Sequence, residues 1–522
     1  MNELIGTIDW SRAQFALTAM YHWLFVPLTI GLALIVAIME TIYVRTGQKA
    51  WKGITKFWMT LFGINFACGI ATGLILEFQF GTNWSNYSWF VGDIFGAPLA
   101  IEGLFAFFLE ATFVAVMFFG WNKVGKRFHL TATWLTAIGV TLSAFWILVA
   151  NAWMQNPVGM EFDPAQMRNV MTDFRAVAFN SVAINKFFHA VFSGWTLAGV
   201  FVCGISCWML WRRRNIEAAR RSIKAGAWVG LAGLLLTMYT GHGSAVEVAR
   251  VQPMKLAAME GLYDGHVNEE LILFGIYNSE IETNPQAEPI KAKIAFPGGL
   301  SFLANGKTGT FVPGINDLIE GREITPEGDT ISTISYKERM SRGAAAQQAL
   351  RDYDQCVACG DTAGMEIARK EIAANYQYFG YGFLNTPEEA IPPVGLTFYS
   401  FHIMVALGMF LLLFFLVALY AVYRCPAFFD KKIVLFIGLL SIPAVWICSQ
   451  AGWIVAEVGR QPWIVQDKMT TGSGISDIGS GAVQTTFWIF AILFTLLLVA
   501  EISIMLRQIS RRSKKDIQND ND

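Results

Sequence analysis

Nine windows of about 20 apolar residues constrain this sequence more than any other feature. A run of that length is what an α-helix needs to cross the ~30 Å hydrocarbon core of a bilayer. The windows lie at about 14–43, 57–77, 95–121, 129–151, 187–211, 222–240, 393–423, 433–456 and 484–506. Of the 522 residues, 54% are hydrophobic and only 15% are charged. The sequence therefore predicts an all-α polytopic membrane protein with nine transmembrane helices.

Basic residues gather in alternate loops and so predict the orientation of the chain. They follow the first, third, fifth and seventh spans and continue into the tail: Arg45, Lys49, Lys52, Lys56, Lys123, Lys126, Arg127, Arg212, Arg213, Arg214, Arg220, Arg221, Arg424, Lys431, Lys432, Arg507, Arg511, Arg512, Lys514 and Lys515. The positive-inside rule then places the N-terminus outside and the C-terminus in the cytoplasm. The start of the chain lacks a basic n-region and a small-residue cleavage site, so we expect no cleavable signal peptide.

The segment between the sixth and seventh spans differs from the rest of the chain. Residues 241–392 are mixed in charge and contain turn formers such as Pro297-Gly298-Gly299. The stretch from Ser335 to Tyr376 has a helical pattern. A loop of this length is usually functional or disordered. We therefore predict three parts: helices 1–6 in residues 1–240, an extracytoplasmic loop in 241–392, and helices 7–9 with a cytoplasmic tail in 393–522.

The cysteine spacing argues against a c-type haem attachment site, and the net charge argues against a nucleic-acid partner. Of the seven cysteines, only Cys356 and Cys359 form a motif, CVACG. A c-type haem attachment site needs histidine after the second cysteine, where Gly360 stands. We expect a local disulfide or two free thiols here. The formal net charge of −1 suggests no nucleic-acid partner.

Residues of the kind that bind metals or protons recur inside the apolar spans. In the predicted topology they gather in the outer half of the bilayer: His22, Glu102, Glu110, His189, His402, Met404 and Glu457. Ionisable groups within a span are costly and usually functional. Glu102 and Glu110 are eight residues apart, which is about 80° around a regular helix, so both can face one interior. A transport pathway or a haem site would explain the group, since His with Met is a low-spin axial pair.

The stretch GWIVAEVGRQPW, 452–463, ends a charge-free run that extends from Ile433 to Ala456. In a helix, Glu457 has Trp453 and Arg460 as neighbours on one face. One interpretation is an interfacial Glu–Arg pair beside a Trp belt. The other is a functional carboxylate at the depth of the remaining candidates.

The chain resembles subunit I of the cytochrome bd quinol oxidases over nearly its whole length. The motifs that carry the resemblance are long and specific: RAQFALTAMYHWLFVPLT (12–29), FGINFACGIATGLILEFQFGTNW (62–84), GDIFGAPLAIEGLFAFFLE (92–110), KFFHA (186–190), VQPMKLAAMEG (251–261) and GRQPW (459–463). The resemblance implies a terminal respiratory oxidase in the bacterial cytoplasmic (inner) membrane. It also implies a second membrane subunit, with small single-span accessory subunits as further candidate partners.

The resemblance further implies two haem b groups, one low-spin and one high-spin, and one haem d. His189 and Met404 match the axial ligands of the low-spin haem b. His22 is assigned to haem d and Glu457 to the high-spin haem b, an order the sequence leaves open. Arg460 matches a basic residue near the haems, and Trp453 is grouped with this site.

The remaining assignments concern protons and quinol. Glu102 and Glu110 match carboxylates implicated in proton delivery. Lys255 and Glu260 match residues of quinol oxidation at the start of the outer loop, called the Q-loop in this family.

Three positions depart from the family pattern without removing a ligand. His402 stands where members often carry Arg, Gln450 where they often carry Glu, and His242 where they often carry Asp. His402 and Met404 are two residues apart and so point to different faces of a helix, which allows only one of them to be an axial ligand.

The expected reaction is the oxidation of ubiquinol or menaquinol outside and the reduction of O₂ to water, coupled to a proton motive force. A haem-b-only oxidase of the same family and an ion or solute transporter are the alternatives.

Overall fold

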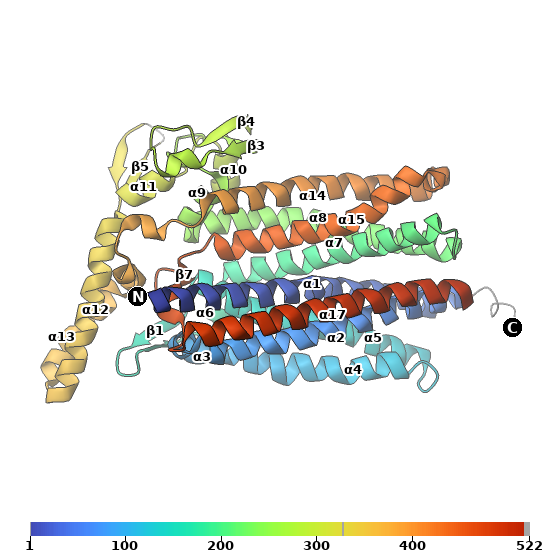
Figure 1. Cartoon of the computed structure of the whole chain (residues 1–522), viewed down its shortest axis with the longest axis horizontal. Coiled ribbons are helices and arrows are strands. Elements are labelled where there is room, and N and C mark those ends of the chain that lie inside the picture. The colour runs from blue at the N-terminus through green and yellow to red at the C-terminus, as the bar shows by residue number, and fades with distance from the viewer. Residues whose placement is uncertain (1, 326–327, 516–522) are drawn as a thin grey trace.

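The computed structural model describes residues 2–325 and 328–515. Long helices run side by side in one bundle, and shorter helices and strands cover the end that carries the N-terminus (Figure 1). In the described residues, nine helical spans are long and apolar enough to cross a membrane. The predicted all-α architecture with nine spans is therefore confirmed.

The spanning helices extend beyond the apolar windows because their polar ends remain helical. They are α1 (Asn2–Thr46), α2 (Lys49–Thr82), α3 (Ser85–Ile101) with α4 (Phe108–Phe119), α5 (Lys126–Gln155), α7 (Ser181–Trp211), α8 (Ile216–Val251), α14 (Val394–Tyr423), α15 (Lys432–Val458) and α17 (Ser480–Lys515). The boundary predicted at residue 240 marks the end of an apolar window, and α8 itself continues unbroken to Val251. Hydropathy marks where a helix leaves the apolar layer, and not where its backbone hydrogen bonds end.

The third span is not a single regular helix. A π-helical segment, Glu102–Phe107, joins α3 to α4, and Gly92 within α3 has a φ of 50°. A π segment turns more slowly per residue than an α-helix and is often found at functional sites. The rotation between Glu102 and Glu110 therefore differs from the value for a regular helix.

Two shorter insertions lie at the same end of the bundle as the outer loop. Between α5 and α7 lie β1 (Met160–Asp163), β2 (Arg168–Met171) and α6 (Phe174–Ala178). After α15 lie β7 (Trp463–Val465), β8 (Met469–Thr470) and α16 (Thr471–Gly474).

The outer loop folds into defined elements. These are α9 (Pro253–Glu260), β3 (Leu271–Tyr277), β4 (Ile290–Phe296), α10 (Gly299–Asn305), α11 (Ile315–Glu320), β5 (Arg322–Ile324), β6 (Thr330–Ser332), α12 (Tyr336–Cys359) and α13 (Thr362–Asn375), with 3₁₀ turns at Ser279–Glu282, Tyr376–Phe383 and Pro387–Ala390. All strand pairs are antiparallel and two-stranded. The helical prediction for 335–376 is confirmed by α12 and α13, which pack as a hairpin across the end of the bundle (Figure 1).

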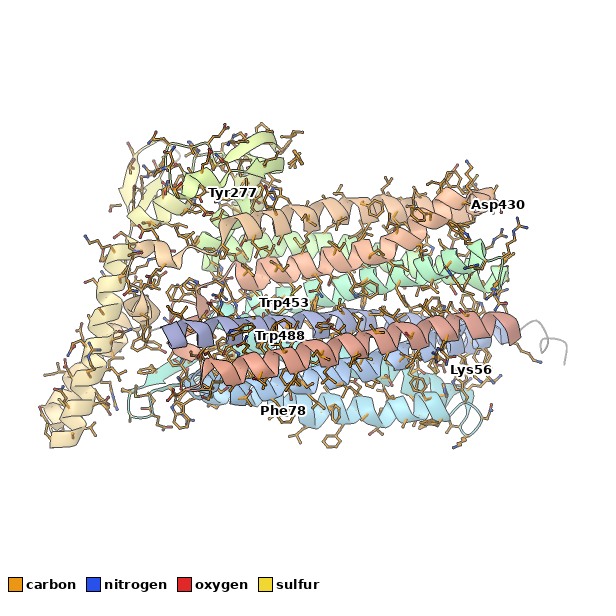
Figure 2. The ribbon with its side chains drawn as sticks, viewed as in Figure 1. Lys56, Phe78, Tyr277, Asp430, Trp453 and Trp488 are labelled. Atoms are coloured by element: carbon orange, nitrogen blue, oxygen red, sulfur yellow. The ribbon has the colours of Figure 1, made fainter. Side chains whose placement is uncertain are left out.

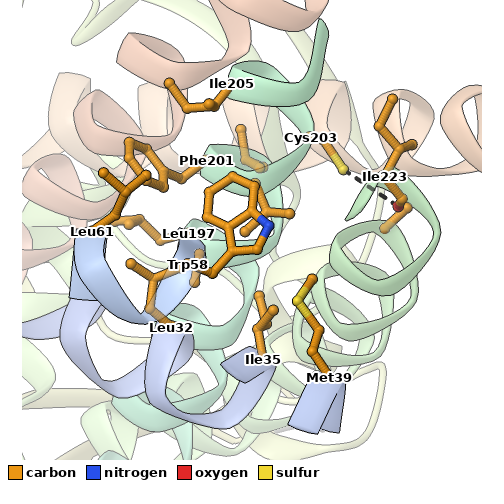
Figure 3. Close-up of a cluster of buried hydrophobic side chains, with 14 of the residues drawn as sticks. Leu32, Ile35, Met39, Trp58, Leu61, Leu197, Phe201, Cys203, Ile205 and Ile223 are labelled. Carbon is orange, nitrogen blue, oxygen red and sulfur yellow. Dashed lines mark hydrogen bonds between the residues drawn. The ribbon is translucent and has the colours of Figure 1, made fainter. Parts of the chain in front are cut away.

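Helix α7 is the centre of the bundle and packs on α1, α5, α8 and α15. A Cβ atom added at Gly31 would lie 2.2 Å from the carbonyl oxygen of Gly194, so these two glycines let α1 and α7 approach closely. Around Trp58, apolar side chains from α1, α2, α7 and α8 form a continuous core (Figure 3). The Trp58 indole nitrogen donates a hydrogen bond to Ser222 at 3.0 Å, which satisfies its only polar atom.

Candidate functional site

His189 and Met404 lie on opposite members of a ring of four helices. His189 is in the first third of α7 and Met404 is in the first half of α14, and each of these two helices packs against both α8 and α15. A Cβ atom added at Gly452 of α15 would lie 2.9 Å from the Met404 sulfur. The glycine therefore leaves room for the thioether on the inner side of the ring.

His22 and His189 make their hydrogen bonds through the same ring nitrogen. Nδ1 of His22 lies 3.0 Å from the Thr72 hydroxyl, and Nδ1 of His189 lies 3.2 Å from the Thr240 hydroxyl. Each arrangement leaves Nε2 available for a ligand. A histidine that binds a metal usually donates its other ring N–H in this way.

Two further histidines are arranged differently. His129 contacts Glu40 through Nδ1 and the Met117 carbonyl through Nε2. His402 contacts the carbonyl oxygens of Phe398 and Ile272 through its two nitrogens, at 2.9 and 3.0 Å. Both rings are thus fully used by the protein. His402 ties β3 of the outer loop to α14, so it is not a candidate ligand, and Met404 remains the candidate axial residue on this helix.

Glu457 lies in a buried polar cluster at the outer end of α15. Its carboxylate pairs with Arg460 at 2.7 Å and accepts a hydrogen bond from Asn151 of α5 at 3.0 Å. Lys186 of α7 donates to the same Asn151 side chain at 2.6 Å. The predicted Glu457–Arg460 pair is confirmed. Asn151 and Lys186 were not predicted, although a lysine inside an apolar span, one turn before His189, is a signal that could have identified Lys186.

Trp453 and Gln450 lie on α15 between this cluster and the middle of the bundle. Trp453 is half-buried, one turn before Glu457, and lies toward the end of the bundle that carries the outer loop (Figure 2). Gln450 donates to the carbonyl oxygen of Met20 at 2.8 Å, two residues before His22. This contact joins α15 to α1 next to a candidate ligand.

Glu102 and Glu110 both face α5. The Ser143 hydroxyl donates to Glu102 at 2.6 Å. The Cβ atom of Glu110 lies 3.3 Å from the position of a Cβ added at Gly139, one turn of α5 away from Ser143. The prediction that the two carboxylates share one interior is consistent with this arrangement, although the π segment lies between them.

Lys255 is buried where α9 meets the ends of α5 and α15. Its ammonium group donates to the Ala456 carbonyl at 2.8 Å, to Gln155 at 3.2 Å and to Gln252 at 3.3 Å. Burial, followed by the neighbouring charge of Lys186, holds the pKa of Lys255 well below its usual value. Lys255 also lines a small cavity, together with Tyr336, Arg339, Tyr381 and Trp463.

Glu260 lies at the other end of α9 and does not line that cavity. Its side chain is 1% exposed in relative terms, and neither carboxylate oxygen has a hydrogen-bond partner among the described residues. Burial, followed by the charge of Glu269, raises the pKa of Glu260 to about 8. The structure thus places both predicted quinol residues on one short helix but does not bring them into one cavity.

The cysteines and acidic groups offer no other metal centre. Cys356 and Cys359 are free thiols, the second of the two expected alternatives. Across residues 2–325 and 328–515, no group of three or more His, Cys, Asp or Glu side chains is arranged to hold a metal ion. The remaining donors are single imidazoles, a thioether and a carboxylate, which is the donor set of haem iron, since the porphyrin supplies the other ligands. The available Nε2 atoms of His22 and His189 fit that group.

Comparisons with known proteins agree over almost the full length. The family model described as "Cytochrome bd terminal oxidase subunit I" matches residues 10–513. The chain is 42% identical to "Cytochrome bd-II ubiquinol oxidase subunit 1" of Escherichia coli (strain K12), over 95% of each chain. It is 33% identical to "Cytochrome bd ubiquinol oxidase subunit 1" of Bacillus subtilis (strain 168), over 100% of this chain and 96% of that one.

A solved structure supports the fold independently. The bd oxidase from Geobacillus thermodenitrificans superposes with a TM-score of 0.77 over 98% of this chain and 100% of that one, at 24% sequence identity. At this identity the likeness concerns the fold alone. The match of the family model over nearly all residues, together with two relatives above 30% identity, shows that this chain belongs to the cytochrome bd terminal oxidase subunit I family.

Proposed function

We propose that this chain oxidises quinol at its outer end and reduces O₂ to water with electrons passed through three haems. The observation that carries the proposal is that His22 and His189, alone among the histidines described above, are anchored through Nδ1 to a threonine. Two relatives are named ubiquinol oxidases, which supports quinol as the donor. Oxidation of two quinols releases four electrons and four protons, and the reduction of one O₂ to two waters consumes the same numbers.

The haem assignment is the one that the resemblance to the family implies. His189 and Met404 hold a low-spin haem b, His22 holds haem d, and Glu457 holds a high-spin haem b. When bound, these haems supply the electron-transfer and oxygen-reduction chemistry. The protein supplies the ligands and their orientation. Arg460 and Asn151 each hold a Glu457 oxygen, and each oxygen keeps a second lone pair for iron.

Quinol binds in the cavity beside Lys255. The rings of Tyr336, Tyr381 and Trp463 offer flat apolar walls for a quinone ring. Lys255 donates a hydrogen bond to one quinol oxygen in place of one of its longer bonds to Gln155 or Gln252. Glu260, at the far end of α9, takes up a released proton and passes it outward. The quinol contact and the proton uptake are assigned to separate places because Lys255 and Glu260 lie toward opposite ends of α9 and only Lys255 lines the cavity.

Protons for water formation come from the cytoplasm by way of Glu110 and then Glu102. The support is the placement of both carboxylates against α5, with Ser143 bonded to Glu102. Uptake from the cytoplasm and release outside would charge the membrane. The N-terminus and the outer loop lie at one end of the bundle, and the described C-terminal helix ends at the other, as this direction requires (Figure 1).

The chain works with a second membrane subunit and with a small single-span subunit. Large apolar side chains such as Phe78, Phe105 and Phe108 are more than 60% exposed on α2 and the third span, which suits an apolar subunit surface. A separate groove of about 580 Å³ lies between α1 and α8. Leu34, Ile38 and Ile42 line it at intervals of four residues, a ridge that fits one apolar helix.

The reduced-minus-oxidised visible spectrum of the purified complex tests the proposal. We expect separate bands of low-spin haem b, high-spin haem b and haem d. A spectrum with haem b alone would favour the haem-b-only oxidase. A purified complex without any haem would favour the transporter.

A further inference from the structure

Two histidines in different helices meet the same dipeptide on a neighbouring helix. His22 of α1 lies against Thr72-Gly73 of α2, and His189 of α7 lies against Thr240-Gly241 of α8. The partners are 50 and 51 residues apart in sequence. We define each dipeptide with its facing ring as a Thr-Gly seat.

The hydrogen bonds of each seat favour one tautomer of the histidine. The Thr72 hydroxyl donates to the carbonyl oxygens of Cys68 and Gly69, at 3.0 and 3.1 Å. The Thr240 hydroxyl donates in the same way to Leu236 and Thr237, at 2.9 and 3.2 Å. With each hydroxyl hydrogen directed at its own helix, the threonine oxygen accepts from Nδ1–H of the histidine. The backbone of Gly69 and of Thr237 also forms a hydrogen bond with His22 and His189, respectively. The lone pair of each imidazole is therefore on Nε2.

The glycine of each seat makes room for the ring, but the two seats differ in tightness. A Cβ atom added at Gly73 would lie 3.0 Å from Cε1 of His22, closer than ordinary van der Waals contact. A Cβ atom added at Gly241 would lie 3.4 Å from Cε1 of His189, which is ordinary contact. Alanine is thus expected to displace the ring at residue 73 and to be tolerated at residue 241.

The Thr-Gly dipeptide alone does not identify a position that faces a histidine. Thr-Gly also occurs at 46–47, 308–309 and 471–472. Those copies lie at a helix end, in a loop and in the short helix α16. Only the two seats lie inside a spanning helix and face a histidine through hydrogen bonds. His129 and His402, which use both nitrogens, meet no such dipeptide.

We infer that Thr72 and Thr240 are positioning residues that hold His22 and His189 as Nδ1–H tautomers, with Nε2 directed at haem iron. The inference rests on the proposed function, which makes both histidines ligands. An N–H bond of this kind orients the ring and raises the basicity of the ligating nitrogen, and its loss typically weakens metal affinity about 10–100-fold. The two threonines act through the histidines and do not touch the reacting atoms.

Threonine-to-valine and threonine-to-serine variants of the full oxidase complex test the inference. Valine keeps the shape of threonine and removes the hydroxyl, whereas serine keeps the hydroxyl. In Thr240→Val we expect the midpoint potential and the EPR signature of the low-spin haem to change. We also expect the retention of this haem to fall about 10-fold or more. The other two haems should remain, and Thr240→Ser should restore the parent signature. Thr72→Val should act in the same way on the haem held by His22.

Matched controls are Thr60→Val on α2 and Thr196→Val on α7, whose hydroxyls bond to carbonyls of their own helices. They should leave all three haems unchanged. The glycine pair gives a second measurement, since Gly73→Ala should perturb its haem while Gly241→Ala should not.

The possible failures are distinguishable. If His189→Ala loses the low-spin haem while Thr240→Val keeps its potential, signature and retention, the seat is not a positioning device. If His189→Ala keeps the low-spin haem, the proposed ligand assignment itself is wrong.

Discussion

The side-chain nitrogen of Lys255 lies 2.8 Å from the carbonyl oxygen of Ala456, the residue immediately before Glu457. A chain of side chains also links the two sites. Lys255 bonds to Gln155, Gln155 approaches Asn151 at 3.4 Å, and Asn151 donates to Glu457. The start of the outer loop is therefore seated directly on the proposed haem-binding end of α15. Quinol-site and haem-site variants should influence each other through these contacts.

Lys255→Met should weaken quinol binding. The change removes the hydrogen bonds of Lys255 to Ala456, Gln155 and Gln252, and it removes the group proposed to bind the quinol oxygen. We expect KM for quinol to rise about 10-fold or more, since lost hydrogen bonds to charged groups are worth roughly 1.5–3 kcal/mol. Oxygen uptake driven by an artificial donor that feeds the low-spin haem should survive. Equal loss with both donors would indicate a structural role.

Glu260 should impose a pH dependence on quinol oxidation. Its pKa is raised to about 8, so below pH 8 the carboxyl group is mostly protonated and cannot accept a proton. We expect kcat/KM for quinol to rise with pH and to level off above about 8. Glu260→Gln should abolish this rise and lower the plateau about 10²-fold or more. Glu280→Gln, on the surface of the same loop, is the control and should keep the parent profile. A rise that persists in Glu260→Gln would assign the titration to another group.

Met404→Leu should convert the low-spin haem to high spin while the other two haems remain. Leucine fills a similar volume but offers no lone pair to iron. Met409→Leu on the same helix is the control, since Met409 is 54% exposed on the outer surface of α14. Visible and EPR spectra of the two purified variants make the comparison. An unchanged low-spin signal in Met404→Leu would remove this residue from the site.

Glu110→Gln should slow oxygen reduction severely and leave the reduction of the low-spin haem by quinol intact. Glutamine keeps the shape of the side chain against Gly139 but cannot relay a proton. Glu501→Gln is a suitable control, because Glu501 is also a buried carboxylate but lies on α17. The measurement is stopped-flow haem reduction together with membrane potential in vesicles. Parent turnover and potential in Glu110→Gln would exclude Glu110 as the relay.

Protease should cut the outer loop from outside without releasing haem. Residues 305–309, between α10 and Phe311, are exposed and offer an accessible site. Cleavage there should impair quinol oxidation, because α9 and α10 belong to the same folded loop, while the haem ligands in the bundle keep their contacts. Sealed right-side-out vesicles should be cut and inverted ones protected. The reverse pattern would overturn the topology.

The sequence by itself determined the architecture and the inventory of candidate ligands. Nine apolar runs sufficed for nine helices, because a backbone in a bilayer must satisfy its hydrogen bonds locally. Histidine, methionine and glutamate within those runs were conspicuous for the same reason, since each is costly there without a role. The Glu457–Arg460 pair was also predictable, because both residues lie on one face of one helix.

Only the tertiary structure decided which groups meet across helices. Three contacts join segments far apart in the chain: His22 with Thr72, His402 with Ile272, and Asn151 with Glu457. The π segment before Glu110 and the separation of Lys255 from Glu260 had no local signal either. Hydropathy and helix periodicity are properties of neighbouring residues. The partner of a side chain depends instead on the crossing angle, depth and rotation of two packed helices, which only the complete fold establishes.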